Sequence, residues 1–539
     1  MSAESTSTAA VMAQYITAAG IKHLFGYPGD PNIEFLEAAR REGIEMILGR
    51  REGTVGFMAE AYGMLTRRPG VCVSTLGPGS TSLVNGVANA YLDRVPMIAI
   101  SGQVATQLEQ FFTHQVIDHN RLYAPITKWT ARMVPEAAGT IMRKAFRVAV
   151  AERPGPVHIT TNGDLLTQSA GDARVTLPPT TPIQLPQLFA TDAEIAAPLR
   201  RLEGARRPIL LTGISALRSG ATKALVRFAE AIGCAVVVSP MSKGVFPEDH
   251  ALYASTIDMA CNTVVWEFLA GSDLIIAVGF DPVELIKPWP LDAPVIHIDS
   301  TPNTDQIYAA DLEIVGHIPS VLEALTASYR GEAKWKESAV ARHRVELRDA
   351  FYSGRVAGKL NPTDVVDAVN DAFPRDTIVT TDVGSHKLLI GQGWCATRPD
   401  GFLMTNGLSS MGFSLPAAIT AKLLHRDRPV VCTIGDGGFA MVQGELQLAS
   451  SLGLGLVVVV FCDNSLNRIE LKQMVKQYPS VLTRIESTDL ERLAGAMGCD
   501  GVRVDDQASL QRVLSGAGGL TRPLVIEARI DPAQYLSQF

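Results

Sequence analysis

Short runs of apolar, mostly β-branched residues recur along the chain and alternate with longer stretches of helical character. Within each run the apolar residues follow one another, without the polar alternation of a strand that faces water on one side. The runs that we predict to be strands lie at residues 71–75, 97–101, 208–212, 234–239, 274–279, 294–299, 377–382, 430–435 and 456–463. Strands of this kind are typical of parallel sheets covered by helices on both faces, so the pattern predicts an α/β fold.

Two interruptions divide this pattern into three blocks. Residues 168–190 carry four prolines among Thr, Gln and Ser, which is too many missing donors for the interior of a helix or strand. Residues 327–362 are charged and helical in character. We therefore expect three open α/β domains of mostly parallel sheet, at residues 1–167, 190–327 and 360–539. Strands that end in glycine turns recur in the first and third blocks, which suggests that these two domains are similar.

The composition narrows the class of protein. A chain of 539 residues with 47% hydrophobic and 19% charged residues is too long for one core and reads as a soluble globular protein. Its formal net charge of −7, without long blocks of one sign, favours neither nucleic acid nor a membrane as a partner. Seven scattered cysteines without a C-x-x-C pair, no signal peptide and no membrane-spanning run predict a cytoplasmic protein.

The stretch 435–464 carries the chemistry that is clearest from the residues alone. A buried strand ends at a G-D-G-G turn that opens a helix, and a second strand then ends on Asp463 and Asn464. If the second strand returns parallel to the first, it brings Asp463 and Asn464 beside Asp436. One carboxylate, one amide oxygen and a nearby carbonyl suit Mg²⁺, and N–H groups at a helix start suit a phosphate. The alternative is that Asp436 only caps a helix and Asn464 only ends a strand.

This stretch resembles the diphosphate-binding motif of thiamine-diphosphate enzymes, which begins with G-D-G and closes near N-N. The resemblance implies that Asp436, the side chain of Asn464 and the main-chain oxygen of Leu466 bind Mg²⁺. It also implies that Gly437 and Gly438, together with Asn464, lie against the diphosphate of the cofactor. Asp463 stands where many relatives have Asn, so the resemblance assigns it no role.

The first block carries the other half of the resemblance. The motifs F-G-Y-P-G-D, a glutamate at position 52, and S-T-L-G-P-G-S-T-S follow one another in the order found in the family. The resemblance implies that Glu52 is the acid that bonds to the aminopyrimidine ring of the cofactor and activates it. It places Gly77, followed by Pro78 and Gly79, beside the pyrimidine. Without the resemblance, Glu52 after two arginines is more typical of a solvated helix start.

The third block contains two further stretches with a counterpart in the family. In T-T-D-V-G-S-H-K, the resemblance places Gly384, Ser385 and His386 at the diphosphate, although His386 is also compatible with a surface turn. In T-N-G-L-S-S-M-G-F, it makes Met411 the apolar residue that wedges between the two rings of the cofactor. The carbonyl of Ser409 then accepts from the exocyclic amine. Packing in the core is the alternative for Met411.

Among these enzymes the chain is most similar to acetolactate synthases of the catabolic type, through F-T-H-Q-V-I-D at 112–118 and G-F-D-P-V-E-L at 279–285. The resemblance implies decarboxylation of a 2-oxo acid, with pyruvate as donor, and addition of the product to a second 2-oxo acid. It makes Gln115 a pocket residue, with His114 beside it, whereas both also suit a surface helix. Asp30 departs from the synthases and is familiar from decarboxylases, so a nonoxidative decarboxylase or another lyase or acyltransferase stays open.

The resemblance also predicts cofactors and assembly. We expect thiamine diphosphate and Mg²⁺, and an active site formed between two subunits, with Glu52 from one and Asp436 from the other. A homodimer is therefore the minimum, and a homotetramer is expected. We predict no tightly bound FAD, because the second block lacks a G-x-G-x-x-G after a strand. A binding or regulatory homologue without activity is the remaining alternative, which the presence of Glu52, Asp436 and Asn464 disfavours.

Overall fold

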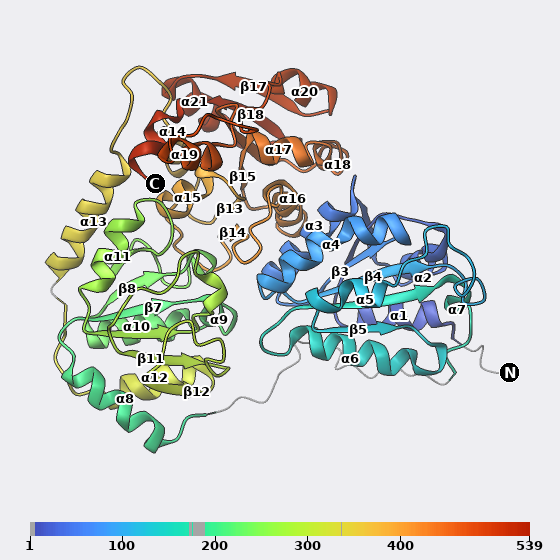
Figure 1. The fold of residues 1–539 in the computed structure, drawn as a ribbon, viewed down its shortest axis with the longest axis horizontal. Coiled ribbons are helices and arrows are strands. Elements are labelled where there is room, and N and C mark those ends of the chain that lie inside the picture. The colour runs from blue at the N-terminus through green and yellow to red at the C-terminus, as the bar shows by residue number, and fades with distance from the viewer. Residues whose placement is uncertain (1–5, 172–174, 176–188, 336) are drawn as a thin grey trace. The chain divides into compact units, whose positions relative to one another are not determined.

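The structure is a computed structural model that describes residues 6–171, 175, 189–335 and 337–539. It confirms the α/β class: the described residues form three sheets of six strands each, and neighbouring strands in every sheet run parallel (Figure 1). All nine predicted runs are strands. Most of the linker predicted at residues 168–190 lies outside the described residues. The chain divides into two compact units, Met1–Leu185 with Gly407–Leu424, and Pro186–Asn406 with His425–Phe539.

The first unit contains the first sheet, in the order β2-β1-β3-β4-β6-β5. Its strands are β1 His23–Gly26, β2 Glu45–Leu48, β3 Gly70–Ser74, β4 Met97–Gln103, β5 Trp129–Arg132 and β6 Pro156–Asn162. Its α-helices are α1 Thr8–Ala18, α2 Ile33–Arg41, α3 Glu52–Thr66, α4 Gly77–Leu92, α5 His119–Tyr123, α6 Ala138–Val150, α7 Gly163–Leu166 and α16 Ser414–Leu424. Helix α3 packs against both α4 and α16, while α1 packs against α2 and α6.

The central sheet lies in the second unit, in the order β12-β11-β10-β7-β8-β9. Its strands are β7 Pro208–Thr212, β8 Ala235–Val238, β9 Tyr253–Thr256, β10 Leu274–Val278, β11 Val295–Asp299 and β12 Leu312–Val315. The helices of this part are α8 Asp192–Gly204, α9 Ile214–Arg218, α10 Thr222–Ile232, α11 Asn262–Ala270, α12 Ile318–Ser328 and α13 Glu337–Phe351. Helix α13 accounts for the charged helical segment that the sequence predicts between the second and third blocks.

The third sheet, also in the second unit, has the order β14-β13-β15-β16-β18-β17. Its strands are β13 Ile378–Thr381, β14 Phe402–Met404, β15 Val430–Gly435, β16 Val457–Cys462, β17 Asp500–Val504 and β18 Leu524–Arg529. Its helices are α14 Pro362–Ala372, α15 Ser385–Gly393, α17 Asp436–Val442, α18 Glu445–Ser451, α19 Asn467–Val475, α20 Leu490–Ala496 and α21 Gln507–Ser515, followed by the 3-10 helix η6 Pro532–Ser537.

The first and third sheets have the same strand order when each is numbered from its own first strand, whereas the central sheet has a different one. The similarity that the sequence suggests between the first and third blocks is therefore present in the topology. In both sheets the order reverses between the first and third strands, which are β1 and β3 in one and β13 and β15 in the other. A crevice at the carboxyl ends of the strands is expected at such a point of reversal.

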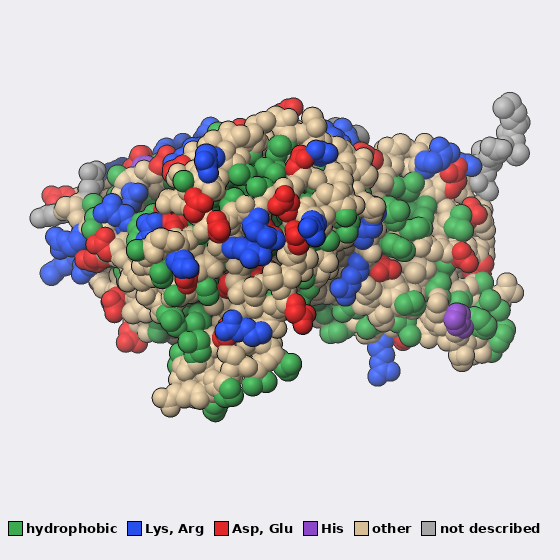
Figure 2. Space-filling view, turned by 90° about the horizontal axis from the view of Figure 1, so that it is seen from above, with side chains coloured by type: hydrophobic (Ala, Val, Ile, Leu, Met, Phe, Trp, Pro, Cys, Tyr) green, Lys and Arg blue, Asp and Glu red, His purple; other side chains and the backbone are tan. Residues whose placement is uncertain are grey.

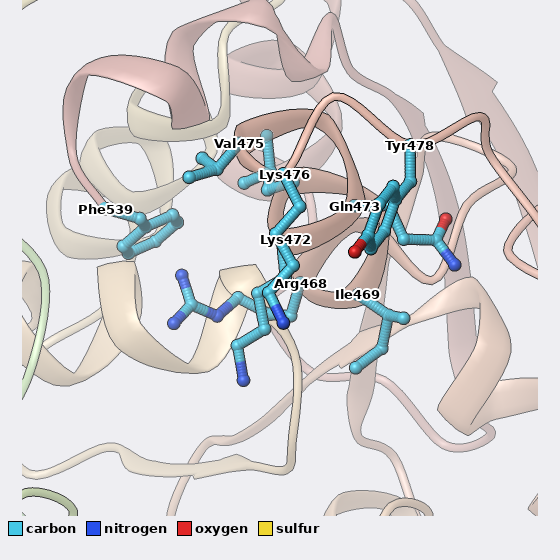
Figure 3. Close-up of a pocket in the computed structure, with 9 residues that line it drawn as sticks. Arg468, Ile469, Lys472, Gln473, Val475, Lys476, Tyr478 and Phe539 are labelled. Atoms are coloured by element: carbon cyan, nitrogen blue, oxygen red, sulfur yellow. The ribbon is translucent and has the colours of Figure 1, made fainter.

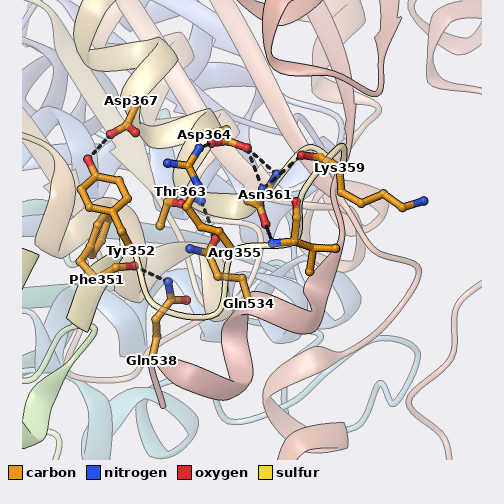
Figure 4. A network of polar contacts seen from close by, with 11 residues as sticks. Phe351, Tyr352, Arg355, Lys359, Asn361, Thr363, Asp364, Asp367, Gln534 and Gln538 are labelled. Carbon is orange, nitrogen blue, oxygen red and sulfur yellow. Dashed lines mark hydrogen bonds and ion pairs between the residues drawn. The ribbon is translucent and has the colours of Figure 1, made fainter. Parts of the chain in front are cut away.

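The C-terminal segment, which consists of η6 and the residues after it, is held in place by side-chain hydrogen bonds. The side-chain oxygen of Gln534 accepts a hydrogen bond of 3.0 Å from the hydroxyl of Thr363, at the start of α14 (Figure 4). The amide of Gln538 donates to the main-chain oxygen of Phe351 at 2.6 Å. Gln534 is fully buried and Gln538 nearly so, which protects both contacts from competition by water. The last residues of the chain are therefore fixed against α13 and α14.

The surface carries charges of both signs. On the face in Figure 2, Lys and Arg side chains are interspersed with Asp and Glu. Within the described part of the chain, no helix has the length and apolar character needed to cross a membrane.

Candidate functional site

The candidate site lies at the carboxyl ends of three neighbouring strands of the third sheet. β13, β15 and β16 are adjacent and parallel, so the residues that follow them meet at one edge. These residues are 382–386, 435–438 and 463–466. The parallel return of β16 along β15, which the sequence predicts, is confirmed by a register that pairs Gly435 with Phe461. The fold therefore gathers the predicted metal and diphosphate residues of the third block at its point of reversal.

Asp436 is the first residue of α17, and its carboxylate is held by the backbone of the neighbouring strand end. One carboxylate oxygen accepts the N–H of Gly437 at 2.8 Å. The other accepts the N–H of Asn464 at 2.8 Å and that of Asp463 at 3.2 Å. Burial raises the pKa of Asp436, although these three hydrogen bonds oppose the rise. A carboxylate that is partly desolvated and fixed in this way is well suited to receive a cation.

Asp463 adds a second carboxyl group to this corner. Burial and the neighbouring charge of Asp436 raise the pKa of Asp463 to about 7. Its side chain accepts the N–H of Ser465 at 3.0 Å, and Asn464 between them has a left-handed backbone with φ 55°. Carboxylate, amide and main-chain oxygens are the donors that Mg²⁺ prefers, so the residues present fit this ion. Among the described residues, no three His, Cys, Asp or Glu side chains form a metal cluster, so a cation here needs neutral oxygens or a ligand as well.

His386 lies on the other side of the Gly435 turn. Its ring is buried on α15, so it is not the surface turn residue that the sequence allows as an alternative. A Cβ atom added to Gly384 would approach this ring to 2.5 Å, and one added to Gly435 would approach it to 3.0 Å. Ser385, on the same helix, donates its hydroxyl to the side chain of Asn467 at 2.7 Å. The three residues predicted at 384–386 therefore lie beside the G-D-G-G turn.

Asp382 is a residue of this site that the sequence reasoning missed. Its carboxylate lies 3.2 Å from Nε2 of His386, and a Cβ atom on Gly438 would approach its other oxygen to 2.9 Å. It is fully buried at the end of β13. The spacing of Asp382 and His386, four residues apart at the start of a helix after a strand, is the signal that could have found the pair.

A cavity of about 400 Å³ opens next to Asp436, and the Asp463 and Asn464 side chains line the same wall. The other lining residues are Phe439, Ala440, Gln443, Cys462, Ile485, Glu486, Ser487, Thr488, Leu490, Glu527, Arg529 and Ile530. Within the cavity wall, Glu527 forms ion pairs with Arg529 at 2.8 Å and with Arg503 at 2.9 Å. The strand ends thus leave room for a polar ligand beside the candidate cation site.

In the first unit, Glu52 is the first residue of α3 and is half-buried. A Cβ atom on Gly79 would approach its carboxylate oxygen to 2.9 Å, so the carboxylate lies directly over the start of α4. Gly77 is similarly close to Gln115: a Cβ atom there would meet the main-chain oxygen of Gln115 at 2.6 Å. The structure therefore brings Glu52 and the L-G-P-G turn together, with residue 115 at the far end of the turn.

Ser409 and Met411 belong to the third block of the sequence but lie in the first unit, in the segment that leads into α16. Ser409 has a left-handed backbone with φ 58°, and Met411 is half-buried. Between them, Ser410 donates its hydroxyl to the side chain of Asn85 on α4 at 2.9 Å. Met411 is therefore not a fully enclosed core residue, and the turn that presents it is attached to α4.

The remaining predicted residues are more peripheral. His114 and Gln115 are exposed and lie in a turn, not in a surface helix, and Gln115 has φ 59°. The ring of His114 contacts that of Phe112 at 6.3 Å between centroids. Asp30 is exposed at the start of a 3-10 helix. These three side chains are available to a ligand but are not held in place by contacts with Glu52.

A buried polar cluster beneath the L-G-P-G turn was also missed. Nε2 of His158 lies 3.0 Å from the hydroxyl of Ser101, and the ring of His158 stacks on Tyr123 at 3.9 Å. Tyr123 donates its hydroxyl to the main-chain oxygen of Ser80 at 2.6 Å. Burial lowers the pKa of His158 well below its ordinary value. These residues are scattered in sequence, so no local pattern announces them.

Comparison with known proteins identifies all three parts of the chain. Residues 6–122 match the thiamine pyrophosphate enzyme N-terminal TPP binding domain, residues 195–325 the central domain, and residues 382–528 the C-terminal TPP binding domain.

Whole-chain relatives carry several names. The chain is 32% identical over 543 residues to a probable acetolactate synthase large subunit of Methanocaldococcus jannaschii. The match covers 97% of this chain and 91% of that protein. It is 28% identical to the acetolactate synthase of Bacillus subtilis, over 95% of this chain and 91% of that one. It is 30% identical to a probable 2-ketoarginine decarboxylase of Pseudomonas aeruginosa, over 95% of this chain and 91% of that protein.

Proposed function

The chain belongs to the thiamine pyrophosphate enzyme family, and we propose that it decarboxylates a 2-oxo acid and joins the product to a second 2-oxo acid, as an acetolactate synthase does. Pyruvate is the proposed donor. The observation that carries the proposal is the pairing of Asp436 with the Asn464 backbone in a chain that is similar to acetolactate synthases along almost its whole length. Thiamine diphosphate, when bound, supplies the carbon nucleophile for the carbonyl of the 2-oxo acid.

We propose that Asp436, the side chain of Asn464 and the main-chain oxygen of Leu466 hold Mg²⁺. The fixed orientation of the Asp436 carboxylate, whose oxygens accept three N–H groups, supports this role. The main-chain N–H of Leu466 donates to the oxygen of Thr483 at 2.7 Å, which fixes the peptide in the turn that follows β16. Asp463 then contributes negative charge beside the ion without being one of its ligands.

The diphosphate contacts are proposed for Gly384, Ser385, His386, Gly437 and Gly438. The ring of His386 lies against Gly435 in the G-D-G-G turn, since a Cβ atom at Gly435 would approach the ring to 3.0 Å. This closeness supports a diphosphate site that both segments share. The N–H groups at the start of α17 favour an anion, although this helix is only 7 residues long and the effect is correspondingly local.

On the pyrimidine side, Glu52 is proposed to hold a proton in a hydrogen bond to the aminopyrimidine ring. The position of the Glu52 carboxylate over Gly79 supports this role. Because Gly79 has no side chain, the carboxylate lies close to the backbone of the turn that the resemblance assigns to the pyrimidine. Met411 is proposed to separate the two rings of the cofactor, and the carbonyl of Ser409 to accept from its amine. Gly77 lines the same part of the site.

Gln115 is proposed to orient the donor substrate, with His114 beside it and Asp30 at the entrance. Their exposure in the first unit supports access to a small molecule. We further propose that the active site forms between two subunits, with Glu52 from one and Asp436 from the other, in a homodimer or homotetramer. All seven cysteines are free, which supports a cytoplasmic location.

The absence of a tightly bound FAD is part of the proposal, and the central sheet supports it. Its strand order reverses between β7 and β10, where a nucleotide phosphate would meet the N–H groups after β7. There the buried carboxylate of Glu284 accepts the N–H of Ile214 at 2.9 Å and that of Asp281 at 2.9 Å, and it also accepts the hydroxyl of Ser239. The carboxyl group of Glu284 thus occupies N–H groups that a nucleotide phosphate would need. Stoichiometric flavin absorbance in the purified protein would overturn this point.

A nonoxidative decarboxylase is the second candidate. The similarity to a probable 2-ketoarginine decarboxylase over 95% of the chain favours it, as does Asp30 in the G-Y-P-G-D motif. The two activities share the loss of carbon dioxide. They differ in whether the fragment that remains takes up a proton and leaves as an aldehyde, or forms a carbon–carbon bond with a second 2-oxo acid.

Product analysis distinguishes these candidates. The protein is incubated with thiamine diphosphate, Mg²⁺ and each of a series of 2-oxo acids, beginning with pyruvate, and the products are identified by mass spectrometry. Acetolactate from pyruvate supports the carboligase, and free aldehyde as the sole product from any 2-oxo acid supports the decarboxylase. Absence of carbon dioxide release from every 2-oxo acid would contradict both and favour a homologue without activity.

A further inference from the structure

Helix α19 carries a row of cations on one face. Arg468, Lys472 and Lys476, which we call the basic face, are four residues apart and therefore lie above one another on the helix and its cap. Like charges at this spacing repel and destabilise a helix slightly. The row therefore requires an explanation other than helix stability.

The basic face lines a pocket of about 420 Å³. Its other lining residues are Ile469, Leu471, Gln473, Val475, Tyr478 and Phe539. Arg468 and Lys472 extend from the same side of the helix, and the ring of Phe539 faces the guanidinium group of Arg468 (Figure 3). The pocket thus combines cations with aromatic and aliphatic walls, and none of its lining side chains is acidic.

Within the part of the chain that the structure describes, no carboxylate forms an ion pair with any of the three cations of the basic face. Glu470, the acidic residue of α19, faces elsewhere: its carboxylate accepts from the hydroxyls of Ser465 and Ser480 and pairs with Arg484 at 2.7 Å. The positive charge in the pocket is therefore left for a ligand or for solvent ions.

Arg468 is the most informative of the three. Lys472 and Lys476 lie near the end of α19, where the helix dipole favours cations, but Arg468 lies in the first turn, where the dipole opposes them. Its guanidinium carbon is 4.5 Å from the centroid of the Phe539 ring, and its side chain is only partly exposed. A half-buried arginine that lacks a carboxylate partner is held ready for an anion.

The aromatic wall is fixed, and does not depend on the ligand. Gln534 and Gln538, which precede Phe539, are anchored to Thr363 and to the main chain of Phe351. Phe539 also stacks on the buried Tyr535, with 5.7 Å between ring centroids. The position of Phe539 opposite Arg468 is therefore a built feature of the fold.

We propose that this pocket binds a small dianion that carries an aromatic or branched apolar group. Its anionic groups bond to Arg468 and Lys472, and its apolar part packs against Phe539 and Val475. Carboxylates and phosphates share the required chemistry. The inference goes beyond the proposed function, because the pocket requires neither the coenzyme nor a metal.

The test measures binding of two aromatic dianions, phthalate and phenyl phosphate, to the full chain by calorimetry, without coenzyme or metal. Neutral benzamide is the matched probe. We expect at least one dianion to bind with 1:1 stoichiometry, and more tightly than benzamide. In the double variant R468Q/K472Q its affinity should fall at least ~10-fold, because two charge-assisted hydrogen bonds are lost. Preference for phthalate or for phenyl phosphate identifies the anion as carboxylate or phosphate.

Two further variants keep the test decisive. R492Q removes one positive charge, from an exposed arginine on α20, and should leave the affinity unchanged. R468K/K472R retains both charges and should bind within a fewfold of the original chain. The proposal is overturned if neither dianion binds, if benzamide binds as well, or if R468Q/K472Q binds as tightly as R492Q while thermal unfolding shows both to be folded.

Discussion

The carboxylate of Asp436 accepts the main-chain N–H of Asn464 at 2.8 Å, so the ends of β15 and β16 are joined by the residues proposed to share a cation. The bond orients the acid through the backbone, and it leaves the side chain of Asn464 free to turn toward a ligand. The position of the carboxylate is therefore set before any ion arrives.

Replacing Asp436 with Asn tests this role, because it keeps the shape of the side chain and removes its charge. Changes to groups behind a metal ligand already lower affinity by ~10- to 100-fold, so loss of a charged ligand should lower Mg²⁺ affinity by at least that factor. Calorimetric titration of Mg²⁺ in the presence of thiamine diphosphate measures the change. Asp500→Asn, at an exposed acid paired with Arg522, is the control. Equal affinity in both variants would remove Asp436 from the metal site.

Replacing Glu52 with Gln tests the proton-transfer role. We expect the rate of carbon dioxide release to fall by ~100-fold or more, since a positioned acid or base contributes a factor of this order. Binding of thiamine diphosphate should change much less. Glu42, which caps the end of α2 and is half-buried like Glu52, provides Glu42→Gln as a control of equal charge. An unchanged rate with every accepted 2-oxo acid would show that Glu52 has no part in the reaction.

Gly79→Ala tests the position of Glu52 without touching its chemistry. The new Cβ atom would lie 2.7 Å from Cγ2 of Thr75 and 2.9 Å from the Glu52 carboxylate, so the carboxylate must move. A displacement of this size should lower the catalytic rate by on the order of 100-fold. Gly518→Ala, where no atom lies within 4 Å, should leave it unchanged. Equal rates in the two variants would contradict the geometry at the start of α4.

Glu284 should make the central sheet sensitive to rising pH. Burial raises the pKa of Glu284 to about 8, so its folded-state pKa lies above the unfolded value of about 4.5. Its contribution to stability is fully present below the unfolded value and is lost as the pH rises through the folded one, at up to ~1.4 kcal/mol per pH unit. Glu284→Gln mimics the protonated form. The difference in melting temperature between the variant and the original chain should therefore shift in favour of the variant from pH 5 to pH 8. A difference that does not change with pH would contradict this expectation.

His119 should make the fold less stable as the pH falls, which is the opposite of the dependence expected from Glu284. It is buried, neither ring nitrogen has a hydrogen-bond partner within the described residues, and burial lowers its pKa to about 4. Neutral His119 therefore makes its full contribution to the stability of the fold above about pH 6.5, and this contribution is lost as the pH falls toward 4. His119→Phe keeps the volume and removes the charge, so it should melt higher than the original chain at pH 5 and similarly at pH 8. His114→Gln, at an exposed histidine, should show no such pH-dependent gain.

Strands that are continuous apolar runs could be predicted from sequence, and strands that are very short or carry polar residues could not. The nine strands found in advance are continuous apolar runs, because both of their faces are covered by helices. The other strands lack such runs. The edge strands β2, β5, β9, β12, β14 and β17 and the interior strand β1 are short, and the interior strands β6 and β18 include polar residues such as His158 and Glu527.

The same division holds for the candidate site. Asp436 and Asn464 could be brought together in advance because they follow adjacent parallel strands. The link between Asp382 and His386 depends on side-chain directions, which their spacing of four residues alone does not settle, and the attachment of Ser410 to α4 depends on long-range packing. The position of Glu284 at the reversal point of the central sheet also depends on long-range packing, and no local motif encodes it.

The anchoring of η6 has a practical side for anyone who purifies this protein. An affinity tag joined after Phe539 would begin beside the pocket that the basic face lines, where an acidic peptide would compete with added anions. A tag at the other end of the chain, followed by its proteolytic removal, avoids that interference in binding measurements.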